Sequence, residues 1–247
     1  MRIKKKAPKP SAKRPPLYFV GYRGPAPRPE ELKTWYDLEY GGPLVIRSED
    51  TASESWNLGH GPWSAHVVIP LPSTHTDGLK EQLAWEHESM GAVAPSITSP
   101  RDIADSVLLA ARLARGLTLL TQGTAYDVTT GAYVNPSDWR DRPLSVFSTG
   151  DHVTIMETDA GDGRQWLYSL GLKKFGLDEV ESFRSTGLST AEAKDMLAEI
   201  ADALARRGEN PKVGSTFAAS SWSVRVLKHR TAVPAGTLVA LREIEVV

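Results

Sequence analysis

The best candidates for chemistry in this sequence are three polar side chains: His60 and His66, six residues apart in the run LGHGPWSAH, and Asp127 in AYDV. A histidine with a carboxylate is the pair that many hydrolases use as a general base and the group that orients it. The sequence has no G-x-S-x-G turn to present a nucleophilic serine, and no H-E-x-x-H helix to supply zinc ligands. A hydrolase that uses His60 or His66 with Asp127 is therefore the alternative function, and we assign no catalytic residue and no metal ligand.

The run WLYSLGLKKFGLDE combines two glycines with two lysines, which are the residue types of a phosphate-binding loop. Such a loop clusters its glycines where several backbone amides open a helix, whereas Gly171 and Gly176 are five residues apart and flank bulky apolar side chains. The spacing favours a structural corner, in which a strand ends at Gly171 and a short helical turn ends at Gly176. On this interpretation, the four charged side chains of the run face water: Lys173, Lys174, Asp178 and Glu179.

Other common chemistries are not indicated. The absence of cysteine excludes disulfides, iron–sulfur clusters and cysteine nucleophiles. No Walker-type loop and no G-x-G-x-x-G after a strand is present. We therefore expect no cofactor.

The elements that must position these residues alternate between helices and strands. The clearest helix is predicted over residues 190–207, where Ser189 and Glu192 match a capping box and basic residues lie in the last turn. A helix is also expected over residues 77–89. Another is expected to begin with Ser99 as its cap and Pro100 in its first turn, with Asp102 near the positive end of the helix dipole, and to end at Gly116; LTLLT is expected to be the strand that follows. No βαβ repeat is seen, so we predict an α+β fold: one domain, residues 17–247, with a largely antiparallel sheet packed by three to four helices.

Charge is distributed unevenly along the chain. Residues 1–16 hold seven of the 29 basic residues and no acid, so the rest of the chain has 22 basic and 30 acidic residues, a net charge of −8. The basic, proline-rich segment 1–16 is predicted to be a disordered tail without the apolar core of a secretory signal. It contains no aromatic residue to stack on a base, so nucleic acid is not the expected partner. No apolar run is long enough to span a membrane, and a cytoplasmic location is expected.

The corner run also carries a pattern, Trp-x4-Gly-Leu-x2-Phe-Gly-x2-Glu, which extends from Trp166 to Glu179. The pattern resembles the C-terminal part of a family of bacterial domains of unknown function, found in hypothetical proteins and around polymorphic toxin loci. The upstream segment ARLARGLTLLTQGTAYDVTTGAYVNPSDW resembles the same family, and together they cover about residues 102–181. The resemblance implies a compact α+β module, with toxin-neutralising immunity proteins among its users, and it transfers no catalytic residue.

These observations favour a non-enzymatic protein-binding module over an enzyme. The acidic body predicts a partner with a basic face, such as a toxin domain that is neutralised by occlusion, because complementary charge speeds association. A binder also needs exposed aromatic anchors. Five aromatic residues at expected loop or helix positions are the candidates: Trp35, Tyr36, Trp56, Trp63 and Trp139.

Overall fold

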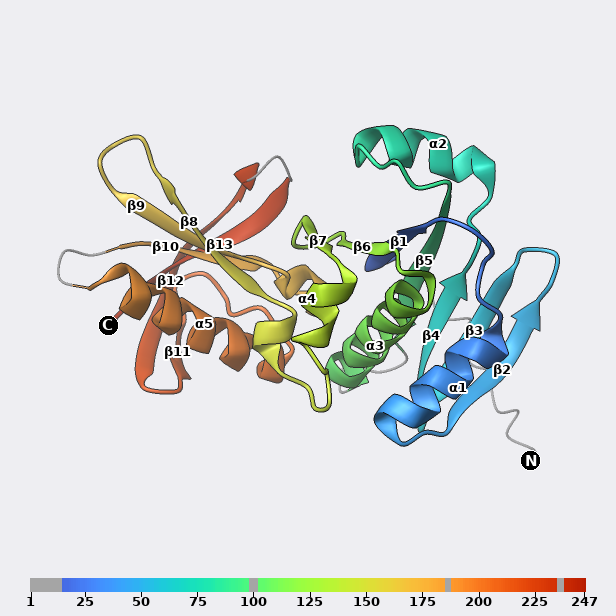
Figure 1. The fold of residues 1–247 in the computed structure, drawn as a ribbon. Helices are drawn as coiled ribbons and strands as arrows, with labels where there is room; N and C mark the ends of the chain where they lie inside the picture. The colour runs from blue at the N-terminus through green and yellow to red at the C-terminus, as the bar shows by residue number, and fades with distance from the viewer. Residues whose placement is uncertain (1–14, 98–101, 185–187, 235–237) are drawn as a thin grey trace, which may run out of the picture.

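The computed structural model describes residues 15–97, 102–184, 188–234 and 238–247 (Figure 1). The basic segment 1–16, predicted to be disordered, lies outside these ranges except for its last two residues. Among the described residues, no helix combines the length and the apolar character needed to cross a membrane.

The first half of the chain builds a seven-stranded sheet, sheet A, in the order β2-β3-β4-β5-β1-β6-β7, and all neighbouring strands are antiparallel. Its strands are β1 (Tyr18–Tyr22), β2 (Leu44–Asp50), β3 (Ser55–His60), β4 (Trp63–Val68), β5 (Ser89–Ser96), β6 (Thr124–Asp127) and β7 (Ala132–Val134). The helices of this half are α1 (Pro29–Tyr40), α2 (Ser73–Gln82), α3 (Ile103–Thr121) and α4 (Pro136–Arg140). Helix α3 packs on β1, β4 and β5, and α1 packs on α3.

The second half builds a six-stranded sheet, sheet B, in the order β11-β12-β13-β10-β9-β8. Only the β10–β13 pair is parallel. Its strands are β8 (Thr154–Asp159), β9 (Gln165–Leu170), β10 (Glu179–Phe183), β11 (Thr216–Ala219), β12 (Trp222–Ala232) and β13 (Val239–Val246). Helix α5 (Thr190–Arg207) lies along this sheet (Figure 1), and it contacts the 3-10 turns η2 (Thr149–Asp151) and η3 (Leu172–Phe175).

The predicted α+β class with largely antiparallel strands is confirmed. The strands are divided between two sheets, where the sequence suggested one, because the segment after β7 carries the chain from sheet A to the start of sheet B. Buried apolar side chains of both halves, from Leu17 to Ile244, nevertheless belong to one continuous cluster. The prediction of a single domain from residue 17 to 247 stays a prediction.

Helix α5 has the predicted bounds and start. The Ser189 amide donates to Glu192 Oε2 at 2.8 Å, and the Glu192 amide donates to Ser189 Oγ at 3.2 Å. The amide of the N-cap residue and that of Glu192 therefore have side-chain acceptors at the helix N-terminus, where amides have no acceptor within the helix.

The predicted start of helix α3, at Ser99 and Pro100, lies outside the described residues. Its end differs from the prediction, because the helix continues through Gly116 to Thr121 and LTLLT is helical. A Cβ at Gly116 would lie 2.5 Å from the Trp35 ring and 2.7 Å from Leu32. Gly116 is thus the point where α1 crosses α3, and its missing side chain serves close packing inside the helix. Helix α2 also differs: it ends at Gln82, so Trp85 and His87 lie in the link to β5 and not on the helix.

Candidate functional site

The backbone amides at Gly171, which a phosphate-binding loop would use to bind a phosphate, instead donate hydrogen bonds to Glu179. Its buried carboxylate accepts hydrogen bonds from the amides of Gly171 (2.9 Å), Leu172 (3.2 Å) and Lys173 (3.1 Å), and from Ser169 Oγ (2.7 Å). Burial raises the pKa of Glu179, while these four donors act in the opposite direction. The expectation that Glu179 faces water is wrong, because the turn at Gly171 needs an internal acceptor for its amides.

Lys174 is also buried, in contrast to the exposed position expected for it. Its side chain is 0% exposed and forms an ion pair with Asp127, at the end of β6. The Lys174 ammonium also donates to the carbonyl of His152 at 2.7 Å. The neighbouring Lys173 is exposed, as predicted. The two lysines of the run therefore differ in role, and the pair between Lys174 and Asp127 connects sheet B to sheet A.

His152 lies beside this ion pair in an apolar setting. Its ring stacks on Phe147 at 5.3 Å between centroids and meets Phe175 edge-on at 6.2 Å. Neither ring nitrogen has a hydrogen-bond partner among the described residues. Burial, reinforced by the Lys174 charge, lowers the pKa of His152 to about 3, so this imidazole is neutral near pH 7.

These contacts account for the Trp-x4-Gly-Leu-x2-Phe-Gly-x2-Glu pattern in structural terms. Gly171 has a φ of +121°, and a Cβ there would lie 2.2 Å from the His152 carbonyl oxygen. Leu172 and Phe175 are buried in the main apolar cluster. Trp166 donates its indole N–H to the buried Glu181 carboxylate at 2.8 Å, which Arg230 also contacts. The pattern therefore stabilises the corner between β9 and β10.

The structure does not bring His60 or His66 to Asp127. His60 ends β3 and His66 lies on β4, whereas Asp127 ends β6. Strands β4, β5 and β1 lie between β3 and β6, so at about 4.8 Å per strand the strands of His60 and Asp127 are about 19 Å apart, and those of His66 and Asp127 about 14 Å. Asp127 is in addition engaged by Lys174 and by the Thr129 amide and hydroxyl. The proposed His–Asp pairing is contradicted by this sheet order.

His60 instead lines a small cavity of about 280 Å³, together with two of the predicted anchors, Tyr36 and Trp63. The His60 ring stacks on Trp63 at 6.4 Å between centroids and lies 5.6 Å from the Tyr36 ring. Arg112 closes one wall by donating to the Leu144 and Ser145 carbonyls and to Tyr36. His60 Nδ1 and the Trp63 indole nitrogen are both buried, and neither has a hydrogen-bond partner among the residues that the structure describes.

The five predicted anchors are mostly inside the protein. Tyr36, Trp56 and Trp139 are buried in the main apolar cluster, and Trp35 and Trp63 are partly buried against it. An anchor has to reach its partner, so only Trp35 and Trp63 keep the accessible ring surface that the prediction requires.

A different set of rings forms a partly exposed aromatic surface on sheet A, which we define as Trp85, Tyr126 and Tyr133. Tyr126 and Tyr133 are direct cross-strand partners on β6 and β7, with ring centroids 5.0 Å apart. Trp85 packs on both, at 6.4 Å and 6.0 Å. Phe19 on β1 is the cross-strand partner of Tyr126, so the row of rings continues across three strands.

This aromatic surface lies on the sheet face opposite to α3. Ala125 and Asp127 are buried on either side of Tyr126 in β6, and side chains alternate between the two faces of a strand. Tyr133 is 46% exposed, and its hydroxyl donates to the Leu83 carbonyl at 2.7 Å, which holds the ring in place. Because β7 is an edge strand of sheet A, a partner protein can approach the rings from the side of the sheet as well as from its face.

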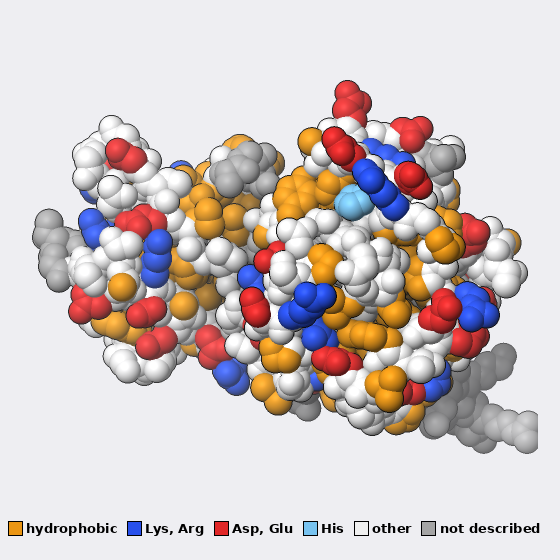
Figure 2. Space-filling view, viewed as in Figure 1, with side chains coloured by type: hydrophobic (Ala, Val, Ile, Leu, Met, Phe, Trp, Pro, Cys, Tyr) orange, Lys and Arg blue, Asp and Glu red, His pale blue; other side chains and the backbone are white. Residues whose placement is uncertain are grey.

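The rim of the aromatic surface is acidic. Two basic residues approach it: Arg23, which lies 4.0 Å from Glu86, and Lys80, which donates to the Glu88 carbonyl. Partial burial and the Arg23 charge lower the pKa of His87, which keeps this imidazole neutral near pH 7. Figure 2 shows acidic side chains around the region of α2, with Lys and Arg side chains between them, next to hydrophobic side chains. Four exposed acids belong to α2 and the link that follows it: Asp77, Glu81, Glu86 and Glu88.

Sequence reasoning missed this surface, although one signal was available. The runs TAYDV and AYV flank the turn Thr-Thr-Gly, and a hairpin closed there places Tyr126 opposite Tyr133. The sequence does not predict that Trp85 packs on these two rings, because the position of Trp85 depends on the residue at which α2 ends.

Comparisons of the chain with protein-family models, with curated proteins and with solved structures give no match. The resemblance to a bacterial family of unknown function therefore stays a prediction. Among the described residues, no group of three or more histidine, aspartate or glutamate side chains is placed to hold a metal ion.

Proposed function

We propose that this protein is a non-enzymatic binding module that recognises a basic protein partner through the aromatic surface of Trp85, Tyr126 and Tyr133. The observation that carries the proposal is the arrangement of these rings: they are packed on one another at the edge of sheet A and partly exposed, and the link that holds Trp85 also carries the exposed acids Glu86 and Glu88. Interfaces concentrate their binding energy in aromatic side chains with a polar rim. The acidic rim, like the acidic body, favours a partner with a positively charged face.

The family resemblance supports one class of partner, a bacterial toxin domain with a basic substrate-binding face. Occlusion of that face by an acidic, aromatic surface would neutralise the toxin without chemistry on the part of this chain. The fixed position of Tyr133, through its bond to the Leu83 carbonyl, supports a surface that is formed before the partner arrives.

The experiment is a binding titration of the full chain with the protein encoded next to it in the genome, followed by a growth assay in which that protein is expressed alone or with this chain. We expect a one-to-one complex at micromolar concentration and restored growth. Tyr133→Ala should weaken the complex by about tenfold or more, since truncated interface hot spots cost about 2 kcal/mol.

The matched control is Leu38→Ala, which removes an apolar side chain that is 84% exposed on α1, away from this surface. Tyr133→Phe keeps the ring and should retain most of the affinity. Absence of a complex, or equal affinities for Tyr133→Ala and Leu38→Ala, would contradict the proposal. A complex without restored growth would support the binding module and reject the toxin.

A further inference from the structure

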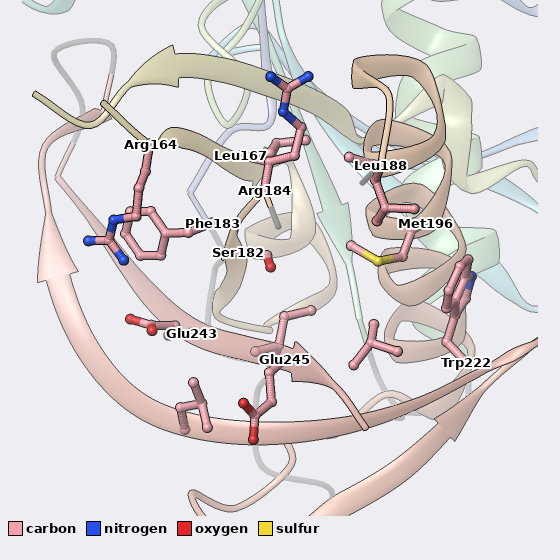
Figure 3. Close-up of a pocket in the computed structure, with 14 residues that line it drawn as sticks. Arg164, Leu167, Ser182, Phe183, Arg184, Leu188, Met196, Trp222, Glu243 and Glu245 are labelled. Carbon is pink, nitrogen blue, oxygen red and sulfur yellow. The ribbon is translucent and has the colours of Figure 1, made fainter. Parts of the chain in front are cut away.

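We propose that the cavity between α5 and sheet B is a binding site for a small amphipathic anion of the medium-chain carboxylate type. The cavity has a volume of about 550 Å³, within the range of about 300–1,000 Å³ that is usual for small-molecule sites. It is bordered by β9, β10, β12, β13 and the first turns of α5 (Figure 3). It shares no residue with the aromatic surface, so this inference is independent of the proposed function.

One end of the cavity is apolar. Leu188, Met196 and Trp222 gather on the α5 side in Figure 3. Leu167 and Ile244 provide buried apolar surface on the sheet side. Two further lining residues remain substantially exposed in the free protein: Leu227 (39%) and Val246 (42%). Covering them would remove apolar area from water, which favours an apolar ligand body.

Each charged residue that lines the cavity, except Arg184, has an oppositely charged group within 4.0 Å, although Glu243 Oε2 makes no hydrogen bond among the described residues. Arg164 pairs with Asp162 at 2.7 Å, Glu243 with Lys228 at 2.7 Å, and Glu245 with Arg225 at 3.4 Å. Arg184 donates to Thr190 Oγ1 at 2.7 Å, and no carboxylate of the described residues lies within ion-pair distance of it.

Arg184 lies at the rim of the cavity, above Leu167, with its guanidinium directed outward (Figure 3). It is close to the start of α5, where the helix dipole also favours an anion. The one acid of that first turn, Glu192, has its carboxylate engaged by the Ser189 amide. The guanidinium can therefore donate hydrogen bonds to the carboxylate of a ligand that projects from the cavity.

These features define an orientation for the ligand. The alkyl chain lies against Leu188, Met196 and Trp222, and the carboxylate emerges at the rim to bond Arg184. A neutral ligand of the same length would gain the apolar contacts but not the charge-assisted hydrogen bond, and a cation would be repelled by Arg184.

The test is isothermal titration calorimetry of the full chain with three ten-carbon probes below their micelle concentrations: decanoate, decanol and decyltrimethylammonium. We expect decanoate to bind most tightly and the cation most weakly. Arg184→Gln should weaken decanoate about tenfold and change decanol less than twofold, because one charge-assisted hydrogen bond is lost. Arg140→Gln, an exposed arginine on α4, is the matched control and should change neither.

A second variant tests the apolar wall. Leu227→Asp should weaken decanoate and decanol about tenfold or more, whereas Leu38→Asp on α1 should not, with circular dichroism to confirm folding. No decanoate binding, equal binding of all three probes, or no effect of Arg184→Gln would overturn the inference. Binding of the protein partner should be unchanged in both variants, which separates this test from that of the proposed function.

Discussion

Lys174 forms a buried ion pair with Asp127, across 47 positions of sequence, and this pair connects the corner between β9 and β10 to the end of β6 in sheet A. Asp127 also fixes its own turn through Thr129, so a single carboxylate serves the β6–β7 hairpin and the contact between the sheets. The hairpin in turn sets Tyr133 opposite Tyr126. The corner motif is thereby linked to the geometry of the aromatic surface.

Removing one partner of this ion pair should destabilise the protein strongly. Lys174→Ala leaves the Asp127 charge buried, which costs about 3–5 kcal/mol, and the adjacent exposed Lys173→Ala should change the free energy of unfolding by less than about 0.5 kcal/mol. Urea denaturation measures both. Similar values for the two variants would mean that the ion pair contributes little.

Replacing Glu179 by glutamine should release the turn at Gly171. The amide group turns one acceptor into a donor that faces backbone N–H groups, and a loss of about 2–3 kcal/mol in the free energy of unfolding is expected. Hydrogen exchange should report faster exchange at the amides of Gly171, Leu172 and Lys173. Glu86→Gln, at a side chain that is 94% exposed, is the control. Unchanged protection at all three amides would be inconsistent with the cradle.

Acid should destabilise the protein partly through His152. In the unfolded chain this histidine takes up a proton below its usual pKa of 6.5, and in the folded protein only below about 3. Protons therefore favour the unfolded state between these values, and the free energy of unfolding falls as the pH is lowered from 6.5 towards 3, by up to about 1.4 kcal/mol per pH unit. His152→Leu should show a shallower fall in denaturation measured at several pH values. Parallel curves for the two proteins would refute the assignment.

Two helical glycines should respond in opposite directions to alanine. Gly116→Ala places a methyl group 2.5 Å from the Trp35 ring and should destabilise by about 1–3 kcal/mol, in spite of the better helix propensity of alanine. Among the described residues, and apart from its own helix backbone, Gly78 in α2 has no atom within 4 Å of the added Cβ, so Gly78→Ala should stabilise by up to about 1 kcal/mol. Thermal denaturation distinguishes the two signs, and a gain in stability at Gly116 would show that the α1–α3 contact is loose.

The acidic rim should act mainly on the association rate. Glu86→Lys with Glu88→Lys should slow association with a basic partner and weaken its dependence on salt, because steering by exposed charges is screened at high ionic strength. Stopped-flow measurements at two salt concentrations test this. Glu209→Lys, at a side chain that is 71% exposed in the second half of the chain, should leave the rate nearly unchanged. A dissociation rate that rises while association stays constant would place these acids inside the contact.

The sequence predicted those elements whose bounds are set by residues a few positions apart. The capping residues Ser189 and Glu192 and the late basic residues placed α5 at its observed bounds. The same kind of reasoning failed at Gly116, where a glycine that resembles a helix end is instead a contact point with Trp35.

Partners distant in the sequence determine the rest. Lys173 and Lys174 are neighbouring residues of the same type, so the local sequence does not distinguish them. Lys174 is the buried one because its ammonium pairs with Asp127, which is 47 positions earlier in the chain. Trp56 and Trp139 are predicted to be exposed rings, but their strand and helix positions direct them into the core. Trp85 joins the aromatic surface only because α2 stops at Gln82.

The place of β13 has a consequence for the order in which the protein assembles on the ribosome. This strand lies between β12 and β10, and it is the bridge that joins the β11–β12 hairpin to the three strands β8, β9 and β10. Those five strands are synthesised earlier, yet they cannot form a continuous sheet until β13 emerges. Sheet A, whose seven strands are all complete by Val134, has no such wait and can form during translation.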